Sequence, residues 1–240
     1  MPMTSSAAST SYGPATPRFH IVSADSDRGP ATLNDHLRSL RQYGEQLKFG
    51  RDATIFHLDE PADRVFEIIK GTVRICRYTP DGRRHVGDFM LAGDLIGFLE
   101  CADQPATAEA VTDVTLISYP RRCFDRIAAS DPSIRKRVLC HISAELLEAQ
   151  RRLFSMGCQN AKERVATFLL RFADRIDVVE GDRLVLPMGR RDIADHLGLT
   201  IETVCRAISA LKNAGTILVP STQQVILRDM AALRSMGLEV

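Results

Sequence analysis

The stretch RRDIADHLGLTIETVCRAISALKNAGTI, residues 190–217, contains the signals of two short helices joined by a tight turn. Gly198 ends the first helix, because glycine takes the left-handed conformation of a helix C-terminus without steric cost. Thr200 is placed to cap the N-terminus of the second helix, with Thr203 three residues further on. The stretch is therefore predicted to form a helix-turn-helix.

Apolar residues occupy one side of both predicted helices, at helical spacing. We expect the buried positions to be Ile193, Ala194 and Leu197 in the first helix and Val204, Ile208 and Leu211 in the second. Because Ala194 is small, the second helix can cross close to the first. The opposite face of the second helix is left free for a partner.

That free face begins with residues suited to reading DNA bases. Arg206 can donate two hydrogen bonds to guanine, and Glu202 can accept one from a cytosine amine or hold Arg206 in place. Cys205 offers a small, weakly polar surface for a thymine methyl group. The predicted base-reading residues are Glu202, Cys205 and Arg206, and the predicted backbone-contacting or supporting residues are Arg190, Arg191, Thr200, Thr203, Ser209 and Lys212. The alternative for Glu202 and Arg206 is a solvated ion pair of little energetic consequence.

The surrounding sequence completes a domain over residues 158–240. A helical segment from Ala161 to about Ile176 precedes a short strand at Leu184–Leu186, and two more strands follow at Ile217–Val219 and Val225–Leu227. The order helix, strand, two short helices and hairpin is that of a winged helix-turn-helix.

A long helix is predicted upstream, over residues 131–157. Asp131 can cap its N-terminus, and Pro132 suits the first helical position. Spacings of 3, 4, 3, 4 and 3 place six residues on one narrow seam: Leu139, Ile142, Leu146, Ala149, Leu153 and Met156. Such a seam favours a two-stranded dimer interface, and the alternative is a helix that packs on its own domain.

Short apolar runs separated by turn signals precede this helix. They lie at Thr54–Leu58, Val65–Ile69, Thr72–Tyr78, His85–Met90 and Val114–Tyr119, and Pro80-Asp81-Gly82 marks a hairpin turn. This spacing predicts an antiparallel β-roll over residues 32–130. Residues 1–31, rich in Ser, Thr, Ala, Pro and Gly, are expected to form a flexible arm. The predicted fold class is thus α+β.

The composition of the 240 residues limits the possible functions. Its 31 basic and 30 acidic residues give a net charge of +1, which does not by itself indicate a nucleic-acid partner. No apolar stretch reaches the roughly 18 residues of a membrane-spanning helix, and no secretory signal begins the chain, so we expect a cytoplasmic protein without a membrane partner. The six cysteines lie at least 17 residues apart, and no metal site is expected. The six histidines are interpreted as structural or surface residues, with no i, i+4 spacing to a carboxylate.

The segment from Asp192 to Thr200, followed by Glu202-Thr203-Val204-Cys205-Arg206, resembles the helix-turn-helix of the Crp/Fnr transcription regulators, and most of all that of their FixK/Fnr branch. The predicted β-roll, long helix and winged domain follow the family's order over roughly residues 45–230. The resemblance implies a homodimer that binds a DNA palindrome like TTGAT…ATCAA through Glu202 and Arg206, with Cys205 in place of the branch's serine. It also implies RNA polymerase contacts and mainly activation of microaerobic, anaerobic or nitrogen-fixation genes.

Departures from other members of that family bear on its control. Residues 1–75 contain no cysteine, so an Fnr-type iron–sulfur cluster is not expected. The stretch matching the cyclic-AMP site reads Gly93 to Phe98 and then Gln104-Pro105-Ala106. Neither Phe98 nor Gln104 supplies the carboxylate and the cation that hold the ribose and the phosphate, and a buried phosphate without a cation is unfavourable. We therefore expect no cofactor and no cyclic-nucleotide control, as in the FixK group.

Three further hypotheses concern regulation and chemistry. Cys205 lies beside Arg206 near a helix N-terminus, so its oxidation is a candidate switch for DNA binding; the alternative is an unreactive thiol in the serine position. A haem- or nitric-oxide-responsive sensor of the same family stays open. An enzyme would need convergent acids, bases or metal ligands in a pocket, and because the strands show none, no catalytic residue is expected.

Overall fold

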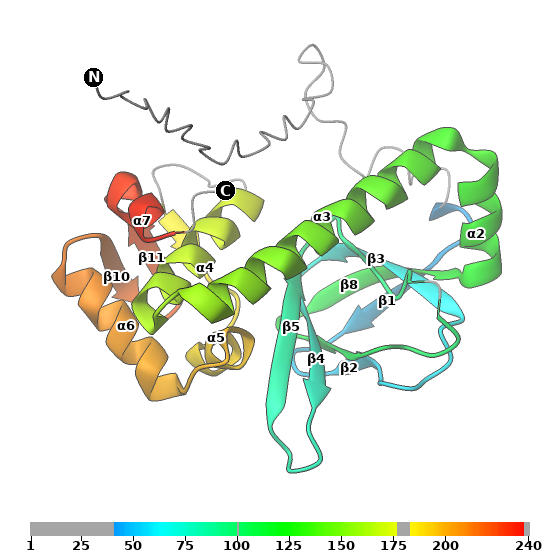
Figure 1. Ribbon diagram of the computed structural model, residues 1–240. Coiled ribbons are helices and arrows are strands. Elements are labelled where there is room, and N and C mark those ends of the chain that lie inside the picture. Colours follow the sequence, from blue (N-terminus) through cyan, green and yellow to red (C-terminus); the bar gives the residue numbers. More distant parts are fainter. Residues whose placement is uncertain (1–40, 100, 177–182, 238–240) are drawn as a thin grey trace, which may run out of the picture. The chain divides into compact units, whose positions relative to one another are not determined.

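The computed structural model describes residues 41–99, 101–176 and 183–237, and Figure 1 shows its helices and strands. The predicted flexible arm, residues 1–31, lies outside these ranges. Within them, no helix is both long enough and apolar enough to cross a membrane.

Two four-stranded antiparallel sheets form the N-terminal roll. One sheet has the order β1 (Glu45–Phe49), β8 (Val114–Pro120), β3 (Arg64–Lys70) and β6 (Leu95–Ile96). The other has the order β2 (Thr54–Phe56), β7 (Thr107–Ala110), β4 (Val73–Tyr78) and β5 (Arg84–Met90). Apolar side chains from both sheets share one core, among them Phe66, Ile68, Val73 and Leu116. The predicted antiparallel roll is confirmed.

Three strands of the roll are absent from the sequence prediction, namely β1, β6 and β7. Strand β7 is Thr-Ala-Glu-Ala, and alanine and glutamate are depleted in strands. It is extended because it pairs with β2 on one side and β4 on the other. The predicted hairpin between β4 and β5 is confirmed, and Gly82 in its turn has a φ of 82°.

The long helix α3 (Pro132–Cys158) begins as predicted. The side chain of Asp131 accepts a hydrogen bond from the Ser133 backbone N–H, and Pro132 occupies the first helical position. A helix that was not predicted, α2 (Arg121–Ser130), precedes it. Phe124 of α2 and Ile134 of α3 are buried in one apolar cluster with side chains of the roll, so this cluster attaches the start of α3 to the sheets.

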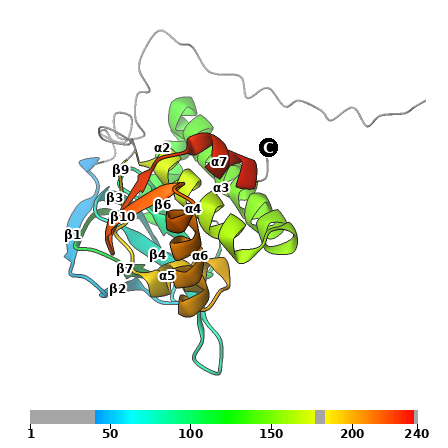
Figure 2. The same ribbon diagram turned by 90° about the vertical axis from the view of Figure 1, so that its left-hand side faces the viewer.

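The C-terminal domain is a winged helix-turn-helix. Its helices are α4 (Ala161–Arg175), α5 (Arg190–Leu197), α6 (Ile201–Asn213) and α7 (Met230–Met236). Its sheet has the order β10 (Ile217–Ser221), β11 (Gln224–Leu227) and β9 (Arg183–Val185). The predicted order of elements is confirmed, and α7 is additional. Figures 1 and 2 both show α7 at the end of this domain away from α5.

Charged contacts join α5 to the β4–β5 hairpin of the roll. The Arg84 guanidinium donates hydrogen bonds to Asp192 at 2.6 Å and to Asp195 at 2.9 Å. Arg74, which is buried in the hairpin, reaches the same oxygen of Asp192 at 3.3 Å. The first helix of the helix-turn-helix is therefore positioned by residues more than 100 places earlier in the chain.

An aromatic contact supports the same junction. The imidazole of His196, in the last turn of α5, lies against Phe89 of β5 and Phe168 of α4, with ring centroids 5.3 and 5.6 Å apart. Its Nδ1 lies 3.1 Å from the carbonyl oxygen of Val86. Burial lowers the pKa of His196 to about 4, so the ring is neutral at physiological pH.

Candidate nucleic-acid interface

The turn of the helix-turn-helix has the geometry that the sequence predicts. Gly198 follows α5 with φ 64° and ψ 38°, in the left-handed region. The hydroxyl oxygen of Thr200 accepts a hydrogen bond from the Thr203 backbone N–H at 3.2 Å and so caps α6. Both interactions act between near neighbours in the chain, which is why the sequence was sufficient to predict them.

The predicted inward faces of the two helices are confirmed. The fully buried residues are Ile193 and Ala194 in α5 and Val204, Ile208 and Leu211 in α6, while Leu197 is partly buried. Because this stripe packs into the domain core, α6 cannot rotate without exposing it. The opposite face of α6 is thereby held toward solvent.

The predicted base-reading residues lie together on that exposed face. Glu202, Cys205 and Arg206 are all exposed. The Arg206 guanidinium donates to the Thr203 hydroxyl at 3.4 Å. The pKa of Glu202 is lowered by a backbone N–H, the Thr200 hydroxyl and the charge of Arg206. The ion pairs among the described residues do not include Glu202 with Arg206, so the alternative of an ion pair between these two side chains is not seen.

The predicted supporting residues differ in exposure. Arg191, Ser209 and Lys212 are exposed, as a contact to a DNA phosphate requires. Arg190 is half-buried, and its Nη1 is buried without a hydrogen-bond partner in the part of the chain that the structure describes. Burial lowers its pKa, and the only other cause is the nearby Cys205, which acts in the opposite direction. Arg190 is therefore partly enclosed by the protein instead of projecting freely into solvent.

The predicted dimer seam is largely exposed on α3. Among its members, Leu153 is 71% exposed, Leu146 59% and Leu139 58%. Ile142, Leu146 and Ala149 also line a cavity of the roll. Phe154, 66% exposed beside the seam, was not singled out because it falls outside the heptad spacing. The chain thus leaves an apolar strip on α3 that its own domains do not cover.

That cavity has a volume of about 410 Å³ and lies between the roll and α3. Its lining includes Phe98 and Gln104, the two uncharged residues that, as the sequence predicts, supply neither a carboxylate for a ribose nor a cation for a phosphate. Arg152 also lines it, and the Arg152 guanidinium donates to Asp88 at 2.8 Å. Arg152, a cation in the lining of this cavity, is therefore already paired with a carboxylate.

The interpretation of the histidines is wrong in one respect. His141 and Glu145 are four residues apart on α3, and His141 Nε2 lies 3.4 Å from a Glu145 carboxylate oxygen. Together with the charge of Asp94, this contact raises the pKa of His141 against the effect of burial. No group of three or more metal-binding side chains occurs among the described residues.

Comparison with known protein families identifies a matching family for each of the two domains. Residues 46–131 match the cyclic nucleotide-binding domain, and residues 163–236 match the Crp-like helix-turn-helix domain. The chain is 38% identical over 216 residues to the nitrogen fixation regulation protein FixK of Azorhizobium caulinodans, covering 89% of this chain and 85% of that protein. It is 35% identical over 193 residues to the transcriptional activatory protein AadR of Rhodopseudomonas palustris, covering 80% and 79%.

Solved structures show the same arrangement of elements. FixK2 from Bradyrhizobium japonicum superposes with a TM-score of 0.77 at 34% identity, covering 82% of this chain and 98% of that one. A CooA mutant from Carboxydothermus hydrogenoformans superposes with a TM-score of 0.73 at 20% identity, covering 86% and 96%, and shares the fold.

Proposed function

The chain belongs to the Crp/Fnr family of DNA-binding transcription regulators, and we propose that it is a homodimeric activator that binds a palindrome like TTGAT…ATCAA. The observation that carries this proposal is the exposed face of α6 with Glu202, Cys205 and Arg206. The names of its relatives support target genes of nitrogen fixation or anaerobic metabolism. The regulator would act in the cytoplasm, with RNA polymerase as its protein partner.

Base recognition follows from the chemistry of that face. Arg206 would donate two hydrogen bonds to a guanine, and Glu202 would accept one from a cytosine amine. Arg191 and Lys212 would contact backbone phosphates, which hold the helix in register without carrying sequence information. Thr200, Thr203 and Ser209 would support these contacts, and Arg190 would do so from its half-buried position at the start of α5.

Fluorescence anisotropy with a labelled TTGAT…ATCAA duplex tests the proposal. The protein is kept reduced, without added metal or ligand, and a duplex with scrambled half-sites is the control at the same salt concentration. We expect tight binding of the palindrome and weak binding of the control. Equal affinity for the two duplexes would contradict the proposed specificity.

Dimerisation would use the exposed seam of α3. The seams of two chains would pack together and so remove this apolar strip from water. Its residues are Leu139, Ile142, Leu146, Ala149, Leu153 and Met156. A two-fold dimer presents two copies of α6 to successive major grooves, about one helical turn apart. The palindromic target is therefore the expected consequence of the symmetry.

Control by cyclic nucleotide is not part of the proposal. In the cavity of the roll, Phe98 and Gln104 offer a nucleotide phosphate no charge, and Arg152 is paired with Asp88. Addition of cyclic AMP should therefore leave the anisotropy titration unchanged. A cyclic-AMP-dependent rise in affinity for the palindrome would show that the cavity does bind a cyclic nucleotide.

Oxidation of Cys205 is the proposed means of redox control. The exposed thiolate would attack a peroxide oxygen, break the O–O bond with release of hydroxide and become a sulfenic acid; a second peroxide would convert it to a sulfinate. The added bulk and charge would face the DNA phosphates. We expect peroxide to abolish DNA binding by the wild type and by Cys158→Ser, another exposed cysteine, but not by Cys205→Ser. Loss of binding by Cys205→Ser in peroxide would refute this role.

The roll cavity also supports a second candidate function, a sensor of haem, nitric oxide or another small molecule in the same family. Its lining is largely apolar, with Phe56, Leu95 and Phe98 among its side chains. An optical spectrum of the freshly purified protein separates the two candidates, because bound haem absorbs strongly in the visible. DNA binding by protein without a chromophore would favour the effector-independent activator.

A further inference from the structure

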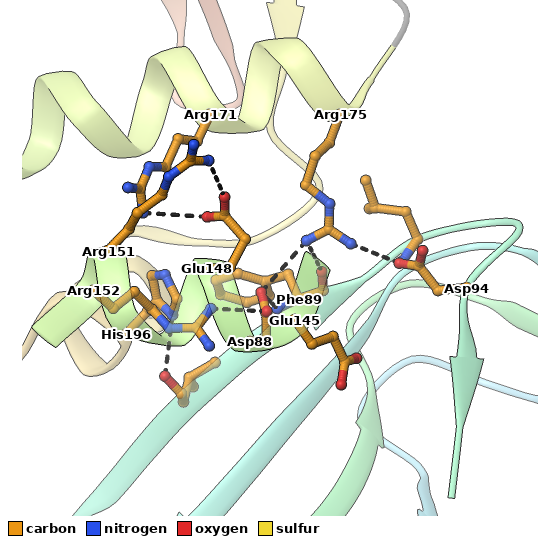
Figure 3. Close-up of polar contacts among 12 residues, drawn as sticks. Asp88, Phe89, Asp94, Glu145, Glu148, Arg151, Arg152, Arg171, Arg175 and His196 are labelled. Carbon is orange, nitrogen blue, oxygen red and sulfur yellow. Dashed lines mark hydrogen bonds and ion pairs between the residues drawn. The ribbon is translucent and has the colours of Figure 1, made fainter. Parts of the chain in front are cut away.

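A second, smaller cavity lies where α3, α4 and α5 meet. Its volume is about 70 Å³, well above what one water molecule needs, so it can hold a small polyatomic ion. Asp88 and Phe89 of β5 complete its lining. It shares only Asp88 and Arg152 with the cavity of the roll. Figure 3 shows several of the polar side chains around it, among them Arg152, Arg171 and Arg175.

The charged residues that line this cavity are mainly positive. They are the four arginines Arg152, Arg164, Arg171 and Arg175 and the two carboxylates Asp88 and Glu148. The arginines come from two helices, α3 and α4, whose junction connects the proposed dimer helix to the DNA-binding domain. The lining therefore has an excess of two positive charges.

Each carboxylate of the cavity is shared between two arginines. Glu148 pairs with Arg171 at 3.2 Å and with Arg151 at 2.8 Å. Asp88 pairs with Arg152 at 2.8 Å and with Arg175 at 3.4 Å, as Figure 3 shows. Of these arginines, Arg175 has a further carboxylate partner, Asp94, at 2.6 Å.

Arg164 adds a cation whose hydrogen bonds go to neutral groups. Its guanidinium donates to the backbone carbonyl oxygens of Gln159 at 3.1 Å, Leu197 at 3.3 Å and Met156 at 2.6 Å. None of the ion pairs among the described residues includes Arg164. This side chain therefore connects the end of α3 with the end of α5, and its charge is not matched by a carboxylate among the described residues.

The excess of positive charge in the cavity acts on the Arg171 guanidinium. Burial lowers its pKa, and the charges of Arg151 and Arg152 lower it further, while Glu148 and Asp88 act in the opposite direction. Phe89, Phe168 and Phe172 form the apolar part of the same lining. Because opposite charges attract more strongly at a partly buried site than in bulk water, an anion in this cavity would relieve the repulsion among the arginines.

We propose that this cavity binds one small oxyanion, a phosphate or a carboxylate, through Arg164 and Arg171. The bound ion would link α3 to α4 beside the end of α5. It would therefore stabilise one position of the DNA-binding domain relative to the proposed dimer helix, and so change the affinity for DNA.

Isothermal titration calorimetry with inorganic phosphate tests the site. The full-length protein is held in a chloride buffer of matched ionic strength, and acetate is titrated separately to distinguish a phosphate site from a carboxylate site. We expect saturable binding of at least one of these ions, close to one per chain. Arg171→Gln should bind at least tenfold more weakly, whereas Arg126→Gln, an exposed arginine of α2, should bind like the wild type.

The calorimetric titration contains no DNA. Failure of the anion site can therefore be distinguished from failure of the proposed DNA-binding function. Thermal unfolding confirms that each variant is folded, and Arg164→Gln provides a second variant if Arg171→Gln is not. Saturable binding that these substitutions weaken supports the site. Absence of saturable binding of both ions, or equal affinity of wild type and variants, overturns it.

Discussion

Arg206 and Arg191 are both exposed arginines of the helix-turn-helix, yet they are expected to act differently on DNA. Arg206 lies in α6, whose N-terminal half faces base edges in this type of domain. Arg191 lies in the first turn of α5, where a DNA phosphate is the natural partner. Only a contact with a base depends on the DNA sequence.

Substitution of the two arginines should therefore give different patterns. Arg206→Ala should weaken binding of the palindrome about 5- to 150-fold, or about 1–3 kcal/mol, with little effect on the scrambled duplex. Arg191→Ala should weaken both duplexes alike and reduce the slope of log affinity against log salt by about one. Anisotropy over a salt series measures both quantities. An equal loss on both duplexes for Arg206→Ala would exclude it from base reading.

His196 makes stability depend on pH. Its pKa in the folded protein is about 4, below the ordinary value near 6.5, so the unfolded chain binds the proton first as pH falls. Stability should therefore be lost as pH falls from about 6.5 towards 4, by about 2 kcal/mol between pH 7 and 5. Urea unfolding at a series of pH values measures this. His196→Gln should lose that part of the pH dependence, and His57→Gln, at an exposed position, should keep it.

At the scale of elements, the β4–β5 hairpin and α5 form one structural unit. Arg84 is 15% exposed and pairs with both Asp192 and Asp195, whereas its neighbour Arg83 is 79% exposed and pairs with Asp81 within the hairpin. Removal of one partner from a largely buried ion pair leaves the other charge without compensation. An exposed pair contributes little.

Arg84→Gln should accordingly destabilise the protein by about 3 kcal/mol, and Arg83→Gln by less than about 0.5 kcal/mol. Chemical denaturation of the two variants beside the wild type measures the difference. Equal stabilities of Arg84→Gln and Arg83→Gln would mean that the contact between hairpin and α5 contributes nothing to folding.

At the scale of the whole molecule, the exposed seam of α3 and the face of α6 depend on each other. A single α6 contacts one half-site, and the second half-site requires a second copy of the chain. The apolar strip on α3 provides the surface through which that copy would be held. Specific DNA binding is thus expected to be lost when the seam is interrupted.

Leu146→Glu places a charge in the middle of the seam and should give monomers with greatly reduced affinity for the palindrome. Sedimentation velocity and anisotropy measure the two effects. Ala144→Glu places the same charge on the other side of α3 and should leave the protein dimeric. A dimeric Leu146→Glu variant would contradict the proposed interface.

Much of this structure was predictable because its causes are local. The cap formed by Asp131, the left-handed Gly198, the Thr200 cap and the spacing of Val204, Ile208 and Leu211 all depend on residues a few positions apart. The face of α6 that carries Glu202, Cys205 and Arg206 follows directly from that spacing. These features determine where the helices begin and end and which face of α6 is exposed.

Only the tertiary structure decided the remaining features, because they join residues that are distant in the chain. Strand β7 is extended because β2 and β4 lie on either side of it, against its own composition. Arg84 and Asp195 are separated by 111 positions, and Arg175 and Asp88 by 87, so no periodicity relates them. The arginine-lined cavity and the burial of Arg190 likewise depend on how separate helices pack. Local preferences determined the elements of the helix-turn-helix and the start of α3, whereas pairing between distant strands made β7 a strand and the matching of buried charges and surfaces determined how the elements meet.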